Sequence, residues 1–447
     1  MLFLRRNSLP VLMTVASMVL ARLGTSAVTY DVSASGDGMG LSEALELAEA
    51  GDTIFLADGT YDTAVVSYRD GKDGQSITIE GGSDAVIKAD YNSRSVQITH
   101  SFISLKGFTV EGKIGDGSDA DAYINKYVYV EGEDSDLDGF VMEGLLIQNC
   151  GGECVRLKNN VVNAEILENT IENCGIHDYE FESDDKNGEG IYIGTSSNQW
   201  VDEAPDTCIG NLVKGNIIST NGNECVDIKE GSTENAVEEN ICTNQLDEDS
   251  ACYDVRGDDN TIRHNIATNC VGAGVRLGGW DVDGYAHGQG NHVYGNDFVD
   301  CGEGSIKVET EGQGDVCDNT CKDGNCELIG SAVGDITETW DKTCGDSGSE
   351  QTSTESSDDT LPVISSSSFK ETEQGYDDDM DDGDDRSDGS DGDDSDEDTG
   401  DGDDHTDDSD SVDSDDDGGN DDDDGGDVEY DDDHDGDTHR NRRDHMD

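Results

Sequence analysis

Short runs of alternating hydrophobic and polar residues recur about every 24 residues through the middle of the chain. Each recurrence begins with an asparagine that heads a short apolar segment, at Asn169, Asn216, Asn240, Asn265, Asn296 and Asn319. Between these segments a pair of apolar residues flanks a polar one, the period of a half-buried strand, as in Val155/Leu157, Ile191/Ile193, Val226/Ile228, Tyr253/Val255, Val275/Leu277 and Ile306/Val308. A unit this short must stack on its neighbours to bury its apolar side. The pattern therefore predicts a stack of short β-strands.

Turns of this size, with Asn or Gly at the corners and little proline, are typical of an all-β fold, the right-handed parallel β-helix. Asparagine suits a corner because it tolerates left-handed backbone and can hydrogen-bond to the Asn of the next turn. Two intervals are longer, 47 residues from Asn169 to Asn216 and 31 from Asn265 to Asn296. They hold extra loops at about 176–187, 196–208 and 279–290. Loops lengthened on one side of a solenoid usually line its binding face.

The segment before the repeat predicts a cap. It holds one helix-like stretch with a narrow apolar stripe, formed by Leu41, Ala44, Leu45, Leu47 and Ala48. Such a stripe suits the open end of a strand stack, which a solenoid must cover. We therefore expect a capping helix and the first turns at 28–112, and the β-helix body at 113–344.

The two ends of the chain differ in composition from the repeat. Residues 1–27 combine two arginines, an apolar run and small residues, the pattern of a cleaved secretory signal peptide. Residues 345–447 are rich in Ser, Asp and Gly, which predicts a disordered acidic tail. The tail holds much of the formal charge of −80, so that charge says little about the folded body. We expect a secreted protein without a membrane span, in the extracellular space or the cell wall.

All 13 cysteines lie between Cys150 and Cys344. In an exported chain they predict disulfides, and the odd count leaves at least one thiol. Strands that stack about 4.8 Å apart lie within disulfide range. Equivalent positions on successive turns favour the pairs Cys225–Cys252 and Cys150–Cys174. A buried ladder of free thiols is the alternative.

One column of equivalent positions is acidic. Glu153, Glu189 and Glu224 precede successive strands, with Asn223 beside them. Carboxylates about 5 Å apart repel each other unless a cation lies between them, and oxygen ligands at this density suit calcium. We therefore expect calcium as a cofactor, bound by Glu224, Glu189 and Asn223. Solvated corner residues are the alternative.

Two neighbouring columns carry cations and further carboxylates. Lys229 and Arg256 lie at equivalent positions of adjacent turns, and a nearby cation lowers a lysine pKa toward that of a useful base. The alternative is a pair of exposed surface cations. Asp227 and Asp254 also stack, and could form an acid–base or nucleophile pair on a sugar, or could orient the cations.

The residues around these columns resemble the pectate-lyase-like right-handed β-helix superfamily. The segments LSEALELAEAGDTIFLADGTY, SITIEGG and ISLKGFTVEG, and a Glu five residues before a strand lysine, are similar to the chondroitinase B and alginate lyase family of polysaccharide lyases. The resemblance implies that Lys229 removes the proton next to a uronate carboxyl, that Arg256 is the general acid or charge stabiliser, and that Glu224 binds calcium.

The expected function is therefore that of a secreted lyase that cleaves an acidic, uronate-containing polysaccharide by calcium-assisted β-elimination. Its substrate would be bound by Arg156, Tyr192, Arg276 and Trp280. We expect a monomer with no nucleic-acid partner. Two alternatives stay open: a glycoside hydrolase that uses Asp227 and Asp254, and a non-catalytic wall or surface protein that binds polysaccharide, with calcium or mineral on its tail.

Overall fold

A computed structural model describes residues 26–91, 94–115, 117–132, 135–181, 187–200, 204–282 and 284–344. All of them belong to one compact unit. The acidic segment 345–447 and the signal-like segment, apart from its last two residues, lie outside the described residues.

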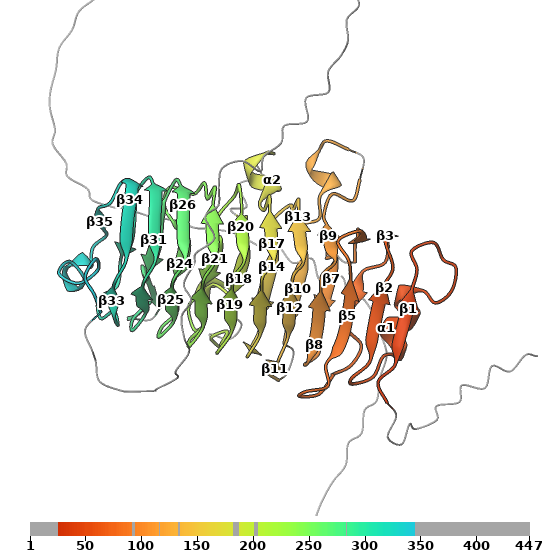
Figure 1. Ribbon diagram of the computed structural model, residues 1–447. Coiled ribbons are helices and arrows are strands. Elements are labelled where there is room, and N and C mark those ends of the chain that lie inside the picture. The colour runs from red at the N-terminus through yellow and green to blue at the C-terminus, as the bar shows by residue number, and fades with distance from the viewer. Residues whose placement is uncertain are drawn as a thin grey trace, which may run out of the picture. The chain divides into compact units, whose positions relative to one another are not determined.

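Three parallel sheets wrap one apolar core, and the chain visits them in the order A, B, C once per turn. Figure 1 shows the resulting stack, from β1 at one end to β34 and β35 at the other. Within these three sheets, the strands pair in parallel with their equivalents in adjacent turns. The predicted right-handed parallel β-helix is confirmed.

Sheet A has eleven strands. They are β1 (Thr29–Val32), β2 (Thr53–Leu56), β5 (Ile77–Gly81), β8 (Ile103–Lys106), β12 (Val141–Glu143), β16 (Glu165–Leu167), β19 (Leu212–Lys214), β22 (Ala236–Glu238), β25 (Thr261–Arg263), β30 (His292–Tyr294) and β33 (Val316–Cys317).

Sheet B has ten strands. They are β3 (Gly59–Tyr61), β6 (Ala85–Ile87), β9 (Thr109–Glu111), β13 (Leu146–Gln148), β17 (Thr170–Glu172), β20 (Ile217–Ser219), β23 (Ile241–Thr243), β26 (Ile266–Cys270), β31 (Asp297–Cys301) and β34 (Thr320–Gly324).

Sheet C, which carries the candidate site, also has ten strands. They are β4 (Val65–Val66), β7 (Val96–Ile98), β10 (Val128–Glu131), β14 (Val155–Lys158), β18 (Ile191–Ile193), β21 (Val226–Ile228), β24 (Ala251–Val255), β27 (Ala273–Leu277), β32 (Gly304–Val308) and β35 (Leu328–Ile329).

The remaining elements lie between these strands or at the ends. Helix α1 (Leu41–Leu47) contacts β1, β2 and β4 at the start of the stack, as a cap does. Its Leu41, Ala44 and Leu45 are buried as predicted, whereas Leu47 is 47% exposed. The others are α2 (Ile176–Tyr179), the pair β11 (Leu137–Asp138) and β15 (Val161–Val162), the hairpin β28 (Trp280–Val282) and β29 (Tyr285–His287), and short 3-10 turns at Ala120–Ala122, Ser197–Gln199 and Val333–Asp335. Among the described residues, no helix has the length and apolar character needed to cross a membrane.

The repeated asparagines form a buried ladder. Each side-chain amide donates to the side-chain oxygen of the next asparagine over 2.9–3.1 Å, from Asn169 to Asn319. The left-handed backbone lies one residue earlier than expected, as at Glu168 and Glu239. The ladder asparagines are therefore selected for hydrogen bonding inside the corner, and the residue before each of them takes the strained conformation.

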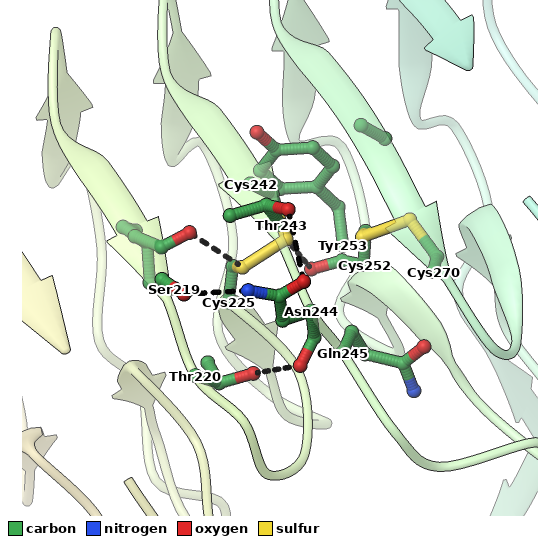
Figure 2. The surroundings of a disulfide bond; sticks show 12 residues. Ser219, Thr220, Cys225, Cys242, Thr243, Asn244, Gln245, Cys252, Tyr253 and Cys270 are labelled. Atoms are coloured by element: carbon green, nitrogen blue, oxygen red, sulfur yellow. Dashed lines mark hydrogen bonds between the residues drawn. A yellow bond between two sulfur atoms is a disulfide. The ribbon is translucent and has the colours of Figure 1, made fainter. Parts of the chain in front are cut away.

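The predicted pair Cys225–Cys252 is wrong. Cys225 and Cys252 are neighbours through their backbones, since the Cys225 amide donates to the Cys252 carbonyl. Their side chains, however, bond to sheet B, Cys225 to Cys242 and Cys252 to Cys270 (Figure 2). Both are buried, and the Cα atoms of Cys225 and Cys242 lie 5.8 Å apart. Cysteines stacked on adjacent strands therefore point together into the core, where the neighbouring sheet offers a partner.

A second cysteine cluster departs from the prediction in a different way. Cys154 lies between Cys150 and Cys174 and is within bonding reach of both. One sulfur carries only one disulfide bond, so one thiol remains in this trio. Cys208 and Cys301 are also free and buried, and the other two pairs are Cys317–Cys344 and Cys321–Cys326.

Candidate active site

The strand register places the predicted columns side by side on the outer face of sheet C. Arg156 pairs with Tyr192, Tyr192 with Asp227, Asp227 with Asp254, and Asp254 with Arg276. Val226 and Ile228 point the other way into the core, because successive residues of a strand face opposite sides. The alternation read from the sequence thus gives the site its geometry.

A network of ion pairs joins the candidate catalytic residues. The Lys229 ammonium lies 2.7 Å from a carboxylate oxygen of Asp227. The Arg256 guanidinium lies 3.4 Å from Asp254, 3.5 Å from Glu230 and 3.7 Å from Asp227. Asp227 is therefore shared by Lys229 and Arg256 and holds them on one patch.

The network is buried, contrary to the alternative of exposed cations. The side chains of Lys229 and Arg256 are each 7% exposed, and those of Asp227 and Asp254 are 1% exposed. Loops lengthened on this side cover them: the backbone amide of Ser197 donates to Glu230 over 3.0 Å, and the Trp280 ring lies 5.5 Å from the Arg256 guanidinium carbon. Solvent therefore reaches a small part of the two cations and almost none of the two carboxylates.

Three buried carboxylates form a group that could hold a metal ion. Glu189, Glu224 and Asp227 each offer an oxygen, and these oxygens lie within 4.8 Å of one another. Two of the predicted ligands, Glu189 and Glu224, are in this group. Asn223 lies beside it and accepts a hydrogen bond from the Tyr179 hydroxyl. The sequence analysis paired Asp227 with Asp254 and did not name it as a metal ligand. Its outward position on the strand that follows Glu224 was enough to indicate that it lies beside the Glu224 carboxylate.

The oxygens of this group suit a hard cation. Apart from its ion pairs, Asp227 accepts no hydrogen bond from the described residues at either buried oxygen. The described outer face of sheet C between β14 and β27 also carries more negative than positive charges. Six carboxylates face five cations there: Glu153, Glu189, Glu224, Asp227, Glu230 and Asp254 against Arg156, Lys158, Lys229, Arg256 and Arg276. Buried charges need compensation, and a divalent cation would supply further positive charge to these carboxylates.

Burial and crowding raise the pKa values of these carboxyls. Burial is the largest cause, and it raises the pKa of Glu224 and of Glu230 to about 7. Burial also raises the pKa values of Glu189 and Asp254 well above the ordinary range, with neighbouring carboxylates adding to the effect. Binding of a metal ion to these carboxyls would therefore release protons.

Lys229 does not have the depressed pKa that the sequence analysis expected from Arg256. Burial lowers the pKa of its ammonium, but Asp227, Tyr192, Glu189 and Glu230 offset this and raise it well above the usual value. The expectation for the lysine pKa counted one neighbouring cation and left out the effect of the carboxylates. The alternative that Asp227 and Asp254 orient the cations agrees with the observed ion pairs.

The predicted substrate-binding residues divide into two groups. Arg156 is buried, 2.5 Å from Glu153 and stacked 3.6 Å from the ring centre of the buried Tyr192. These two residues support the site from within. Arg276 and Trp280 keep some of their surface exposed, and Arg276 lies 3.9 Å from Asp254.

Comparison with known proteins supports the fold. No family description matches the chain, and neither does any curated protein. Among solved structures, an alginate lyase from Paenibacillus sp. str. FPU-7 is 22% identical with a TM-score of 0.55, over 68% of this chain and 98% of that chain. Pectate lyase Pel9A is 14% identical with a TM-score of 0.48, over 69% of this chain and 79% of that one. The chain thus shares its predicted right-handed parallel β-helix fold with this alginate lyase.

Proposed function

We propose that this protein is a secreted polysaccharide lyase that cleaves a uronate-containing polymer by calcium-assisted β-elimination. The observation that carries the proposal is the position of Lys229 and Arg256 on adjacent turns, both in contact with Asp227 and next to the Glu189–Glu224–Asp227 group. A strong base, a cationic donor and a calcium-type ligand set are the components that this reaction needs. The likeness to an alginate lyase supports the fold on which they are arranged.

In the proposed reaction the C–H bond next to the uronate carboxylate breaks, and its proton goes to the Lys229 amine. The electron pair forms a carbon–carbon double bond, and the C–O bond to the leaving sugar breaks. The leaving oxygen accepts a hydrogen bond from Arg256 and takes a proton from water. Glu189, Glu224 and Asp227 would hold calcium, which would neutralise the substrate carboxylate and acidify the adjacent proton.

Lys229 must lose its proton to act as the base. Its pKa is raised by carboxylates, above all Asp227, and burial alone lowers it. If those carboxylates are neutralised, burial and the neighbouring Arg256 both act to lower the lysine pKa. Calcium dependence and lysine basicity are therefore linked in this proposal.

Secretion is supported by two independent features. The first residues have the pattern of a secretory signal peptide. The described residues also contain core disulfides such as Cys225–Cys242 and Cys252–Cys270, which persist mainly in oxidising compartments.

A hydrolase that uses Asp227 and Asp254 is the second candidate. Burial and the adjacent Asp227 raise the pKa of Asp254 well above its usual range, as a general acid requires. Against it, both carboxylates are only 1% exposed and are paired with cations, so they reach a sugar less readily than Lys229 or Arg256 does.

Product chemistry tests the proposal. We would incubate the purified protein with alginate, pectate and chondroitin sulfates, with calcium or a chelator, and follow ultraviolet absorbance and reducing ends. A lyase gives an unsaturated, absorbing end that disappears with chelator, a hydrolase gives reducing ends alone, and a binding protein gives neither. Lys229→Ala should abolish the absorbing product, and Lys229→Arg should be almost as inactive because guanidinium does not deprotonate. Lys322→Ala, a 64% exposed lysine on sheet B, is the control.

A further inference from the structure

The two longest insertions on the sheet C side meet at a group of aromatic rings. Trp200 belongs to the loop between β18 and β19, and the β28–β29 hairpin between β27 and β30 carries Trp280, Tyr285 and His287. The Trp200 and His287 ring centres lie 6.0 Å apart at 85°. Those of Tyr285 and His287 lie 4.8 Å apart at 78°. We call these four residues the aromatic cluster.

The aromatic cluster is fixed to the turns that follow the two candidate catalytic residues. The loop of Trp200 is tied to Glu230, directly after Lys229, through the Ser197 amide. The hairpin is tied to Asp258, two residues after Arg256, which accepts hydrogen bonds over 2.8 Å from the amides of Gly288 and Gln289.

Asp258 also orients two rings of the aromatic cluster. Its second oxygen lies 3.2 Å from the Tyr285 hydroxyl and 3.3 Å from His287 Nδ1. The Trp280 ring in turn lies over Arg256. The cluster therefore borders the Lys229–Arg256 pair at the side where the strands of sheet C end.

The rings of the aromatic cluster are accessible. Tyr285 is 50% exposed, and Trp200, Trp280 and His287 are partly exposed. An aromatic face that is not fully covered offers apolar surface to the C–H face of a pyranose ring, and its rigid side chain loses little entropy on binding.

The charges around the aromatic cluster select against an anionic sugar. Asp258 lies within it, and Asp281 lies on the same hairpin. At the base of the hairpin, Glu309 approaches Gly279 beside Arg276, whose charge is paired with Asp254. Within the described part of the chain, the cation in contact with a ring of the cluster is Arg256, which is already engaged by carboxylates. A uronate carboxylate would meet repulsion here, whereas a neutral pyranose would not.

We propose that Trp200, Trp280, Tyr285 and His287 form a binding subsite for a neutral pyranose ring. Together with the proposed function, on which this step rests, the subsite makes the substrate a heteropolysaccharide in which a neutral sugar adjoins the uronate at the cleaved linkage. A homopolymer of uronate would be the poorer substrate.

Binding of neutral oligosaccharides tests the subsite without any requirement for cleavage. We would titrate the full-length protein, in chelator, with mannose, glucose, galactose and xylose tetrasaccharides and a uronate tetrasaccharide, following tryptophan fluorescence and calorimetry. At least one neutral tetrasaccharide should bind. Tyr285→Ala and Trp200→Ala should each weaken it about tenfold, while Tyr285→Phe, which keeps the ring, should bind nearly as well as the native protein.

Tyr68→Ala is the matched control. Tyr68 is an exposed tyrosine like Tyr285, with 44% of its surface accessible, but it follows β4 near the start of the stack, far from the aromatic cluster in the sequence. Absence of binding by every neutral tetrasaccharide, or equal affinities for the native protein and both ring-removing variants, overturns the subsite. If neutral binding depends on Tyr285 but no polymer gives an unsaturated product, the subsite stands and the lyase proposal fails. If a uronate homopolymer is cleaved equally by the native protein and Tyr285→Ala, and no neutral sugar binds, the lyase proposal stands and the subsite fails.

Discussion

Asp227 is the side chain at which the ion-pair network and the carboxylate group meet. It lies 2.7 Å from Lys229 and belongs to the group formed with Glu189 and Glu224. One carboxylate thus couples the proton affinity of the proposed base to the occupancy of the proposed metal site. Removing the Asp227 carboxylate should therefore change both the proton affinity of Lys229 and the binding of calcium. A carboxylate that only held an ion pair in place would not change calcium binding.

We expect Asp227→Asn to weaken calcium binding at least tenfold, because an amide oxygen carries no net charge to attract the ion. Glu224→Gln should behave in the same way. Calorimetric titration of the purified protein with calcium measures this. Asp254→Asn is the control, since it removes a neighbouring buried carboxylate that lies outside the group of three, and equal losses in all three variants would contradict the assignment.

Arg256→Ala should lower kcat/KM for elimination by the equivalent of about 2 to 4 kcal/mol, the order seen when one stabilising donor is removed. Steady-state rates on the best polymer measure it. Arg263→Ala, which breaks an ion pair with Glu238 on sheet A, should leave the rate within about twofold. A rate in Arg256→Ala close to that of the native protein would exclude a role for Arg256 in the transition state.

At the scale of elements, the sequence predicted the strands and their register more fully than the contacts between side chains. The columns Arg156–Tyr192–Asp227–Asp254–Arg276 follow from alternation alone, and the register confirms them. Alternation says which residues share a face, but it does not say how far that face is covered by distant loops. For this reason the burial of Lys229 and the raised lysine pKa were missed.

The disulfides also show that sequence spacing predicts the register of the strands but not which side chains meet. Equivalent spacing correctly placed Cys225 beside Cys252 along the stack, yet the bonds run from sheet C to sheet B within the core. We expect peptide mapping without reduction to find Cys225–Cys242 and Cys252–Cys270, with Cys208 and Cys301 as thiols. One thiol should remain in the Cys150–Cys154–Cys174 trio. A Cys225–Cys252 peptide would contradict the structure.

The buried asparagine ladder should be sensitive to single changes. Asn240 donates to the Val213 carbonyl and to Asn265, and it accepts from Asn216. Asn240→Ala should lower the free energy of unfolding by about 2 to 4 kcal/mol, because several buried partners lose their hydrogen bonds. Asn244→Ala, in the partly exposed row of asparagines outside sheet B, should cost less than Asn240→Ala, because the groups that lose its hydrogen bonds stay close to water. Chemical denaturation of the two variants compares them.

At the scale of the whole molecule, the excess of buried carboxylates makes stability depend on pH and on calcium. Burial raises the pKa of Glu230 in the folded protein to about 7, above its usual value of 4.5. Its contribution to stability is therefore complete below about pH 4.5 and is lost as the pH rises toward 7. The loss for this one carboxyl is about 3 kcal/mol.

We expect the melting temperature in chelator to fall between pH 4.5 and 7.5. Glu230→Gln, which stays neutral, should flatten some of that fall. Calcium should reduce the fall in the native protein, because it supplies the missing positive charge at the neighbouring carboxylates. Thermal scans over this pH range, with and without calcium, measure both effects. Identical pH profiles for the native protein and Glu230→Gln would show that this carboxyl is ionised at neutral pH.

The asparagine ladder has a consequence for how this molecule can change in evolution. Because every turn from Asn169 to Asn319 offers its neighbours the same amide and carbonyl groups, a duplicated or deleted turn in this part of the stack finds matching partners on both sides. The solenoid can therefore grow or shrink by whole turns with little cost at the joins. The exceptions are the junctions between β18 and β21 and between β21 and β24, since Glu189, Lys229 and Arg256 come from three successive turns and must stay adjacent. An extra turn inserted between β21 and β24 would leave the protein folded but would move the proposed base, Lys229, away from Arg256.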